Sequence, residues 1–150
     1  EKELNCRIFT RSASGLTPEE MEEGAAQIAD LLNREGVSAD HVTMSTDAFG
    51  SQPKFNEIGE CIGLTYASPK YLHQTVQSLV RRGLPLEEVL KMVTSTPADL
   101  LAKKGVKGCV AEGADADILV LGEELAIESL FMRGKTAVLN GKVLMKGRFE

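Results

Sequence analysis

The sequence has little cysteine and no excess of positive charge. Its three cysteines, Cys6, Cys61 and Cys109, show no Cys-x-x-Cys spacing. A disulfide scaffold or a zinc knuckle is therefore not expected, and the thiols are predicted to be free, as in a reducing compartment. With 17 Lys and Arg against 22 Asp and Glu, the net charge is −5. Nucleic-acid binding and attachment to a membrane surface through a basic patch are therefore not expected.

Long apolar runs are also missing. The longest are too short and too interrupted to cross a bilayer, and the charged start of the chain, EKELNCRIFTR, has no apolar segment typical of a signal peptide. We therefore expect a cytoplasmic protein. The 150 residues are enough for one domain with its own core. The first residue is Glu and not Met, which by itself is weak evidence but keeps open that this is a piece of a longer protein.

Residues 1 to about 105 alternate between strand and helix patterns. Leu4–Thr10 and Val42–Thr46 are typical of strands, and LTPEEMEEGAAQIADLLNREG between them is typical of an amphipathic helix with Pro18 as its first residue. An irregular stretch is predicted over Asp47–Ser68. Further helices are predicted over residues 68–83, 85–95 and 96–105. This order is typical of parallel βα units.

The pattern changes after Gly105. Short strands separated by turns are predicted, and LNGK carries a hairpin signal because Asn-Gly accepts the positive φ angles of a type I′ turn. The predicted strands lie in residues 116–122, 127–134, 136–141 and 142–149. This part predicts a small antiparallel sheet, separate from the βα units.

The stretch VTMSTDAFGSQP, residues 42–53, ends an apolar strand on Asp47 and continues with small residues. In a βα barrel, the loops after the strands carry the chemistry, and a short carboxylate rooted on a rigid strand can hold a metal ion or a water molecule. Ser51 offers a hydroxyl or a backbone N–H to an anionic group. An Asp that caps a turn gives the same pattern, and spacing alone favours the cap.

Several motifs resemble isoaspartyl dipeptidases, which are members of the amidohydrolase superfamily. STDAFGSQP is similar to the segment after their eighth barrel strand, and AEGADADILVL and VLNGKVLMKGRFE are similar to the strands of their C-terminal β-sandwich. YLHQTVQSLVRRGLPLEEVLKMVTSTPADLL is similar to the helices between them. The resemblance covers about residues 17–150 and implies an α/β fold. Residues 1–105 would be the last βα units of a (β/α)8 metal-dependent hydrolase barrel, and residues 106–150 strands of a small β-sandwich.

The same resemblance implies an activity and a site. Asp47 falls on the family's metal-ligating aspartate, which also acts as the general base, and Ser51 falls on a serine that contacts the dipeptide. The implied reaction is hydrolysis of a β-aspartyl peptide bond in a small dipeptide substrate at a binuclear zinc site. The family forms large homo-oligomers, so we expect the full-length protein to be a homo-oligomer.

Most of that site is absent from the sequence. Only two histidines, His41 and His73, are present, and no His-x-His occurs. His41 is expected at the surface and His73 is expected to be structural. Cys61 lacks a readable general base, so we expect a small buried side chain there and not a nucleophile. Catalytic zinc takes three or more protein ligands, and a barrel needs about 250 residues. We therefore expect a C-terminal part of the enzyme, inactive and poorly soluble by itself.

Two alternatives stay open at this point. One is another amidohydrolase that acts on a cyclic amide, as dihydroorotases and hydantoinases do, because the sandwich motifs fit it equally well. The other is a non-catalytic assembly module built around a small β-sheet. The loop from Asp47 to Pro53 favours the dipeptidase over both, since a scaffold needs no strand-end Asp followed by an open loop.

Overall fold

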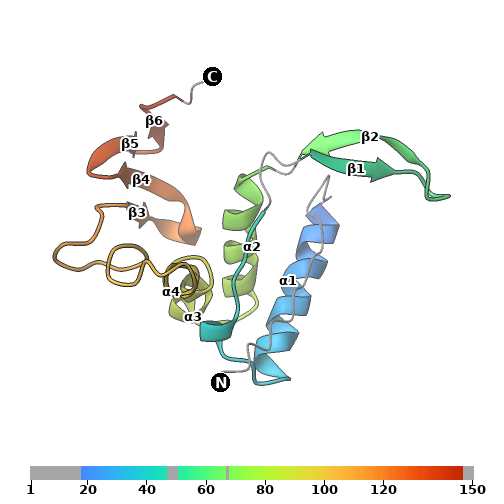
Figure 1. Ribbon diagram of the computed structural model, residues 1–150, viewed down its shortest axis with the longest axis horizontal. Coiled ribbons are helices and arrows are strands. Elements are labelled where there is room, and N and C mark those ends of the chain that lie inside the picture. Colours follow the sequence, from blue (N-terminus) through green and yellow to red (C-terminus); the bar gives the residue numbers. More distant parts are fainter. Residues whose placement is uncertain (1–17, 47–50, 67, 147–150) are drawn as a thin grey trace.

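The computed structural model describes residues 18–46, 51–66 and 68–146. It opens with helix α1, Pro18–Asn33, which confirms the predicted helix and its first residue (Figure 1). Proline suits the first helical position because its fixed φ fits a helix and its missing N–H has no intrahelical partner there. Ala25 and Ala29 form the buried face of α1, and their small side chains let the next helix approach closely.

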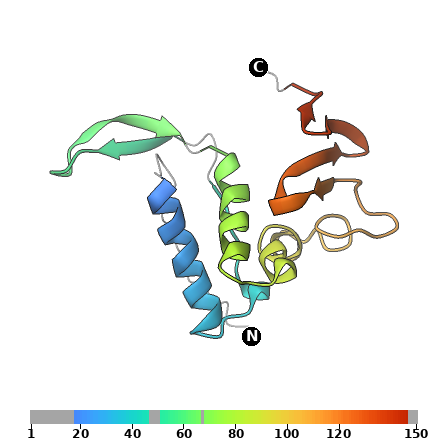
Figure 2. The same cartoon turned by 180° about the vertical axis from the view of Figure 1, so that it is seen from behind.

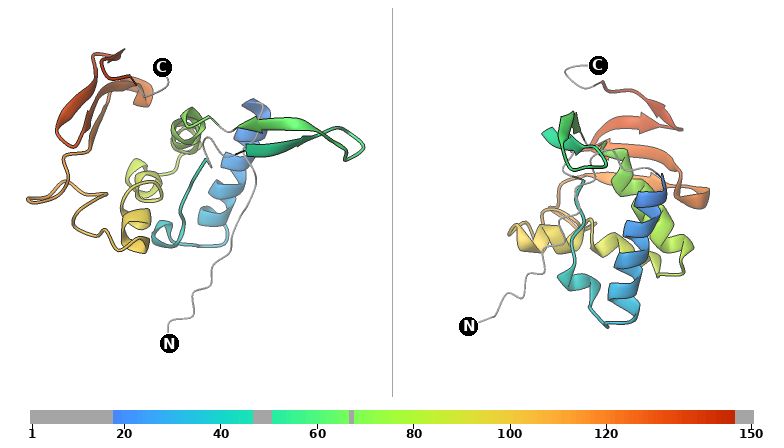
Figure 3. Two further views of the ribbon diagram at one scale, coloured as in Figure 1. Left: turned by 45° about the horizontal axis from the view of Figure 1, so that its top comes forward. Right: turned by 90° about the vertical axis from the view of Figure 1, so that its right-hand side faces the viewer.

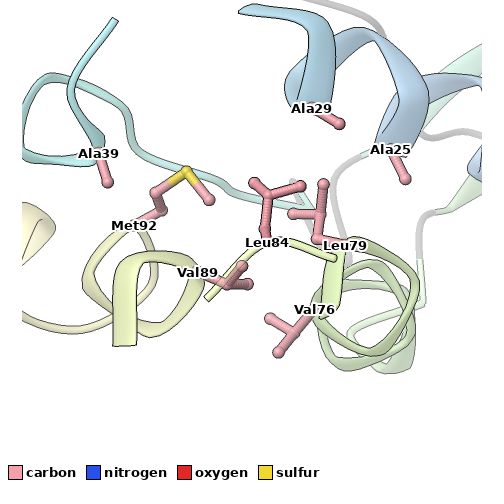
Figure 4. Close-up of a cluster of buried hydrophobic side chains, with 8 residues drawn as sticks. All are labelled: Ala25, Ala29, Ala39, Val76, Leu79, Leu84, Val89 and Met92. Atoms are coloured by element: carbon pink, nitrogen blue, oxygen red, sulfur yellow. The ribbon is translucent and has the colours of Figure 1, made fainter. Parts of the chain in front are cut away.

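Three more helices confirm the predicted helical region between residues 68 and 105. They are α2, Lys70–Arg81; α3, Leu86–Lys91; and α4, Ser95–Leu100. Together with α1 and the segment after it, α2 and α3 enclose the main core, shown in Figure 4. Its buried members are Ala25, Ala29, Ala39, Val76, Leu79, Leu84, Val89 and Met92. The core is thus helical, with medium-sized aliphatic side chains on α2 and α3 set against alanines on α1.

The predicted strand Val42–Thr46 does not join a sheet among the described residues. A short 3-10 helix, η1 (Ala39–His41), precedes it, and Val42 has extended φ and ψ of −118° and 133°. A backbone bond from Met44 N–H to Met92 O, at 3.1 Å, holds the segment against the helical part of the chain. A strand needs a neighbouring strand to form a ladder. The other strand predicted in this half, Leu4–Thr10, lies outside the described residues.

The prediction of an irregular stretch over Asp47–Ser68 is wrong for much of its length. Strands β1 (Ser51–Phe55) and β2 (Cys61–Tyr66) form an antiparallel hairpin, with Ser51 opposite Tyr66 and a register shift after Lys54. Pro53 and Gly63 are both disfavoured in strand interiors, so they obscured the strand pattern. The hairpin extends away from α1 and α2, as seen in Figures 1 and 2 and in the left view of Figure 3.

The C-terminal part is an antiparallel sheet, as predicted. Its order is β3-β4-β5-β6, and the 3-10 helix η2 (Glu123–Leu125) lies between its first two strands. Asn140 and Gly141 have φ of 49° and 73°, which confirms the predicted type I′ hairpin turn. The strands are Ile118–Leu121, Ile127–Met132, Lys135–Leu139 and Lys142–Val143, so the last is much shorter than the predicted 142–149.

Apolar side chains of this sheet are uncovered on both faces. Ile118, Leu119 and Val120 are consecutive in β3 and are 40, 43 and 40 % exposed. Successive side chains of a strand point to opposite faces, so both faces at β3 leave apolar side chains partly exposed to water. The division of the chain near residue 105 into barrel and sandwich parts stays a prediction.

No helix in the described part of the chain combines the length and the apolar character needed to cross a membrane.

Candidate functional site

The segment that leads to Asp47 is anchored to the helical core. Ala39 is 3 % exposed, and its carbonyl accepts a hydrogen bond of 3.1 Å from Thr96 Oγ1. Val42 and Met44 pack against the core cluster, whereas Thr43 between them is exposed. The packing of Val42 and Met44 on the core and the Met44 bond to Met92 therefore hold this segment against the helices.

The segment that begins at Ser51 is also ordered by backbone pairing. Ser51 is the first residue of β1, at the base of the hairpin, and its partner across the ladder is Tyr66. Asp47 lies outside the described residues, and of Ser51 the structure describes the main chain. The two predicted site residues are therefore flanked by two structured segments, and their roles stay predictions.

The two histidines lie in separate places. His41 ends η1 and is exposed, as expected for a surface residue. His73 is half-buried on α2, and its Nε2 lies 2.8 Å from the carbonyl oxygen of Leu125 in η2. Four residues further along α2, Gln77 Nε2 donates to Glu124 O at 3.0 Å. His73 therefore helps to hold η2 on α2, which agrees with the expected structural role.

The described cysteines do not form a reactive centre. Cys61 and Cys109 are both exposed and free. The expectation that Cys61 is buried is wrong, because β2 belongs to a two-stranded hairpin that no other described element covers. Its thiol donates a weak bond to the Gly63 carbonyl, with the sulfur 3.5 Å from the oxygen.

A metal centre is not complete in the described residues. Among them, no three His, Cys, Asp or Glu side chains gather closely enough to hold a metal ion. Since catalytic zinc takes three or more protein ligands, the described residues do not fit such a centre, and Asp47 could add one ligand at most.

A charged cluster lies between α1 and α2. Glu22 accepts hydrogen bonds from the Ser78 hydroxyl at 2.7 Å and from Arg82 Nη2 at 2.9 Å. The Ser78 bond first, and then the Arg82 bond, hold the pKa of the Glu22 carboxyl below its ordinary value. Ser78 is 1 % exposed, so its hydroxyl needs this partner. The cluster joins two helices and has no open ligand position of its own.

A second charged cluster lies at the GADAD motif that precedes β3. Lys107 forms ion pairs with Asp115, at 2.8 Å, and with Asp117. Asp117 Oδ1 also accepts the Arg133 N–H at 2.7 Å, which ties the turn between β4 and β5 to the start of β3. These bonds raise the pKa of Lys107 and lower that of Asp117. The motif therefore has a structural function in which each carboxylate is paired.

A family assignment rests on the match of residues 11–144 to the model described as the amidohydrolase family. The chain belongs to this family. Members of this family generally use metal ions.

Solved structures give a narrower similarity. The chain is similar to the β-aspartyl dipeptidase of Fervidobacterium islandicum AW-1 in complex with a β-Asp-Leu dipeptide, with 33 % identity and a TM-score of 0.70. That match covers 91 % of this chain and 35 % of the dipeptidase. A second structure described as β-aspartyl dipeptidase from the same organism matches with 27 % identity and a TM-score of 0.64, over 90 % of this chain and 32 % of the other.

A more distant match concerns the fold alone. The N-acetylglucosamine-6-phosphate deacetylase of Pasteurella multocida shares 17 % identity at a TM-score of 0.56, over 76 % of this chain and 34 % of that enzyme. This amidohydrolase chain thus spans about a third of the length of each of these enzymes. Mixed helices and strands, together with these neighbours, indicate an α/β fold.

Proposed function

We propose that the protein to which this chain belongs hydrolyses the β-aspartyl bond of dipeptides. The observation that carries the proposal is the similarity to the Fervidobacterium dipeptidase, at 33 % identity over 91 % of the chain. The deacetylase match, at 17 % identity, gives no support to any other substrate. Because the chain spans 35 % of the dipeptidase, the proposal concerns the whole protein.

In this proposal Asp47 is a metal ligand and the general base, and Ser51 contacts the dipeptide. The structure on each side is suitable for these roles. Asp47 directly follows a segment fixed by the Met44–Met92 bond, and Ser51 opens a strand paired at its base with Tyr66. Residues next to such anchored segments vary little in position, and catalysis requires this precise positioning.

The metal in this proposal is a pair of zinc ions, with most ligands supplied by residues that precede this chain. The described residues offer no cluster that could replace those ligands. Asp47 would accept the proton of the attacking water and pass it to the leaving amine. By itself, the 150-residue chain should therefore be inactive.

The architecture proposed for the complete protein is a (β/α)8 barrel with a small β-sandwich. Uncovered apolar side chains on both faces at β3 support this proposal, since a single sheet layer with exposed Ile118, Leu119 and Val120 leaves apolar area in water. Further strands and helices of the complete protein would cover them. We also propose that the complete protein is cytoplasmic and homo-oligomeric.

The test is zinc content and hydrolysis of β-Asp-Leu, measured on this chain and on a form extended upstream to a full barrel. We expect two zinc ions and cleavage in the extended form and neither in the short one. Asp47→Ala should lower kcat of the extended form by at least about a thousandfold because it removes a ligand and the base together. Glu112→Gln, in an exposed turn, is the matched control and should leave kcat unchanged.

Other outcomes separate the parts of the proposal. An extended form that binds zinc and ignores β-Asp-Leu would keep the family assignment and refute the substrate. Full activity of Asp47→Ala would refute the role of that residue. Chelation with EDTA should abolish cleavage, and added zinc should restore it; cleavage that survives chelation would refute metal dependence.

A further inference from the structure

The β1–β2 hairpin presents apolar side chains that nothing in the described part of the chain covers. Pro53 and Leu64 are partners across the ladder and so point to one face, and Phe55 follows the register shift at the end of β1. Leu64 is 73 % and Phe55 57 % exposed. A two-stranded hairpin is marginally stable in water without a packing partner, so we expect this one to pack on a surface outside the described residues.

The tip of the hairpin is locked in one conformation. Asn56 Oδ1 accepts the N–H of Ile58 at 3.2 Å and that of Glu60 at 2.8 Å, and Asn56 N–H donates to Glu60 O at 3.0 Å. This loop presents Ile58, 79 % exposed, between the carboxylates of Glu57 and Glu60. A rigid tip loses little conformational entropy when it binds, and an apolar side chain ringed by charges is typical of an interface anchor.

A groove of complementary character lies between α1 and α2. Its volume is about 340 Å³, and its lining residues are Met21, Lys70, Tyr71, Gln74, Gln77 and Arg81. Met21 and Tyr71 offer apolar contact area, whereas Lys70 and Arg81 add two cations to its lining. The side chain of Arg81 is 64 % exposed and lies 3.5 Å from the nearest Glu22 oxygen, so it can reach a further carboxylate.

Resting on the proposed homo-oligomeric state, we propose that the hairpin tip of one molecule docks into the α1–α2 groove of a second copy. The two carboxylates of the tip would meet Lys70 and Arg81, and Ile58 would pack on Met21 and Tyr71. The hairpin extends away from both helices, so the tip does not contact its own groove (Figures 1 and 3). A reciprocal exchange about a two-fold axis buries two tips and two grooves, and charge complementarity sets the pairing.

Charge exchange tests the pairing directly, in the complete protein that contains this sequence. One variant carries Glu57→Lys and Glu60→Lys, and the other carries Lys70→Glu and Arg81→Glu. Each alone brings like charges together, so we expect the dimer dissociation constant, measured by analytical ultracentrifugation, to rise at least tenfold. Mixed in equal amounts, the two should form a heterodimer with near wild-type affinity, because both contacts regain opposite charges.

Controls keep folding separate from docking. Glu112→Lys with Lys142→Glu reverses exposed charges elsewhere and should leave the dimer unchanged. Because Glu60 also accepts a bond from Asn56 and Arg81 lies near Glu22, Glu57→Lys and Lys70→Glu form a second, milder pair with the same expected rescue. Ile58→Ser should weaken the dimer without a charge change.

Three results would overturn the proposal. The first is a wild-type protein that is monomeric at all concentrations. The second is an unchanged oligomer in both charge-reversed variants. The third is weakening without rescue on mixing, which would indicate that the hairpin packs on its own chain or on a different protein.

Discussion

The Ser78 hydroxyl on α2 donates a 2.7 Å hydrogen bond to Glu22 on α1, and Arg82 binds the same carboxylate oxygen at 2.9 Å. One carboxylate thus joins the two longest helices of the described chain beside the buried core residue Leu79. The proposed docking groove lies between the same helices, so this bond also fixes the distance between its walls.

Removing the hydroxyl should loosen the two helices. Ser78→Ala leaves a small cavity and takes one hydrogen bond from Glu22, so we expect the free energy of unfolding to fall by about 1 kcal/mol. The Ser78 side chain is 1 % exposed, whereas Glu22 is 41 % exposed and can accept a bond from water instead, which keeps the expected loss small. Urea denaturation measures the change, with Glu112→Gln as control. An unchanged midpoint would mean that the Ser78 bond contributes nothing to the fold.

The same carboxylate predicts a pH dependence. Its hydrogen bonds, from Ser78 first and then Arg82, lower the pKa of Glu22 from 4.5. A lowered folded-state pKa gives stability that is present above the unfolded value and is lost as the pH falls through the folded value. Wild type should therefore exceed Glu22→Gln in stability above about pH 5, and the difference should shrink as the pH falls below 4.5. A difference constant from pH 3 to pH 7 would contradict this.

A third prediction concerns the contact between α2 and η2. His73 and Gln77 bind the consecutive carbonyls of Leu125 and Glu124, two residues whose φ values of 59° and 53° are unusual for non-glycine residues. In His73→Ala this turn loses its brace, and amide hydrogen exchange at Leu125 and Ala126 should become roughly five- to tenfold faster, equivalent to about 1 kcal/mol. Gln74→Ala on the same helix is the control and should leave both amides unchanged.

Local signals made part of this fold predictable. Pro18 marked the first turn of α1, and Asn140-Gly141 marked a hairpin turn, because in each case the backbone conformation depends on the residue itself. The β1–β2 hairpin was missed since its turn depends on the side chain of Asn56, which binds two backbone N–H groups. Nothing in the alternation of apolar residues reports such a bond.

Non-local partners limited the rest. Val42–Thr46 has the composition of a strand, yet a strand exists only where a neighbour pairs with it, and no described segment does so. The prediction that Cys61 is buried was wrong for a related reason, because the exposure of Cys61 depends on what covers the hairpin. Family resemblance predicted the assignment correctly. The roles of Asp47 and Ser51 depend on a site completed by other residues, so they stay predictions.

The last prediction uses two glycines of the segment KGVKG, Gly105 and Gly108, which have φ of 77° and 70°. A Cβ at Gly105 meets nothing within 4 Å, whereas at Gly108 it would lie 2.6 Å from the backbone oxygen of Thr94. Gly105→Ala should cost about 1 kcal/mol for the backbone conformation alone. Gly108→Ala adds a clash with main-chain atoms and should cost about 3 kcal/mol or more. Urea midpoints of the two variants measure the difference, and equal midpoints would refute the close approach of Gly108 to Thr94.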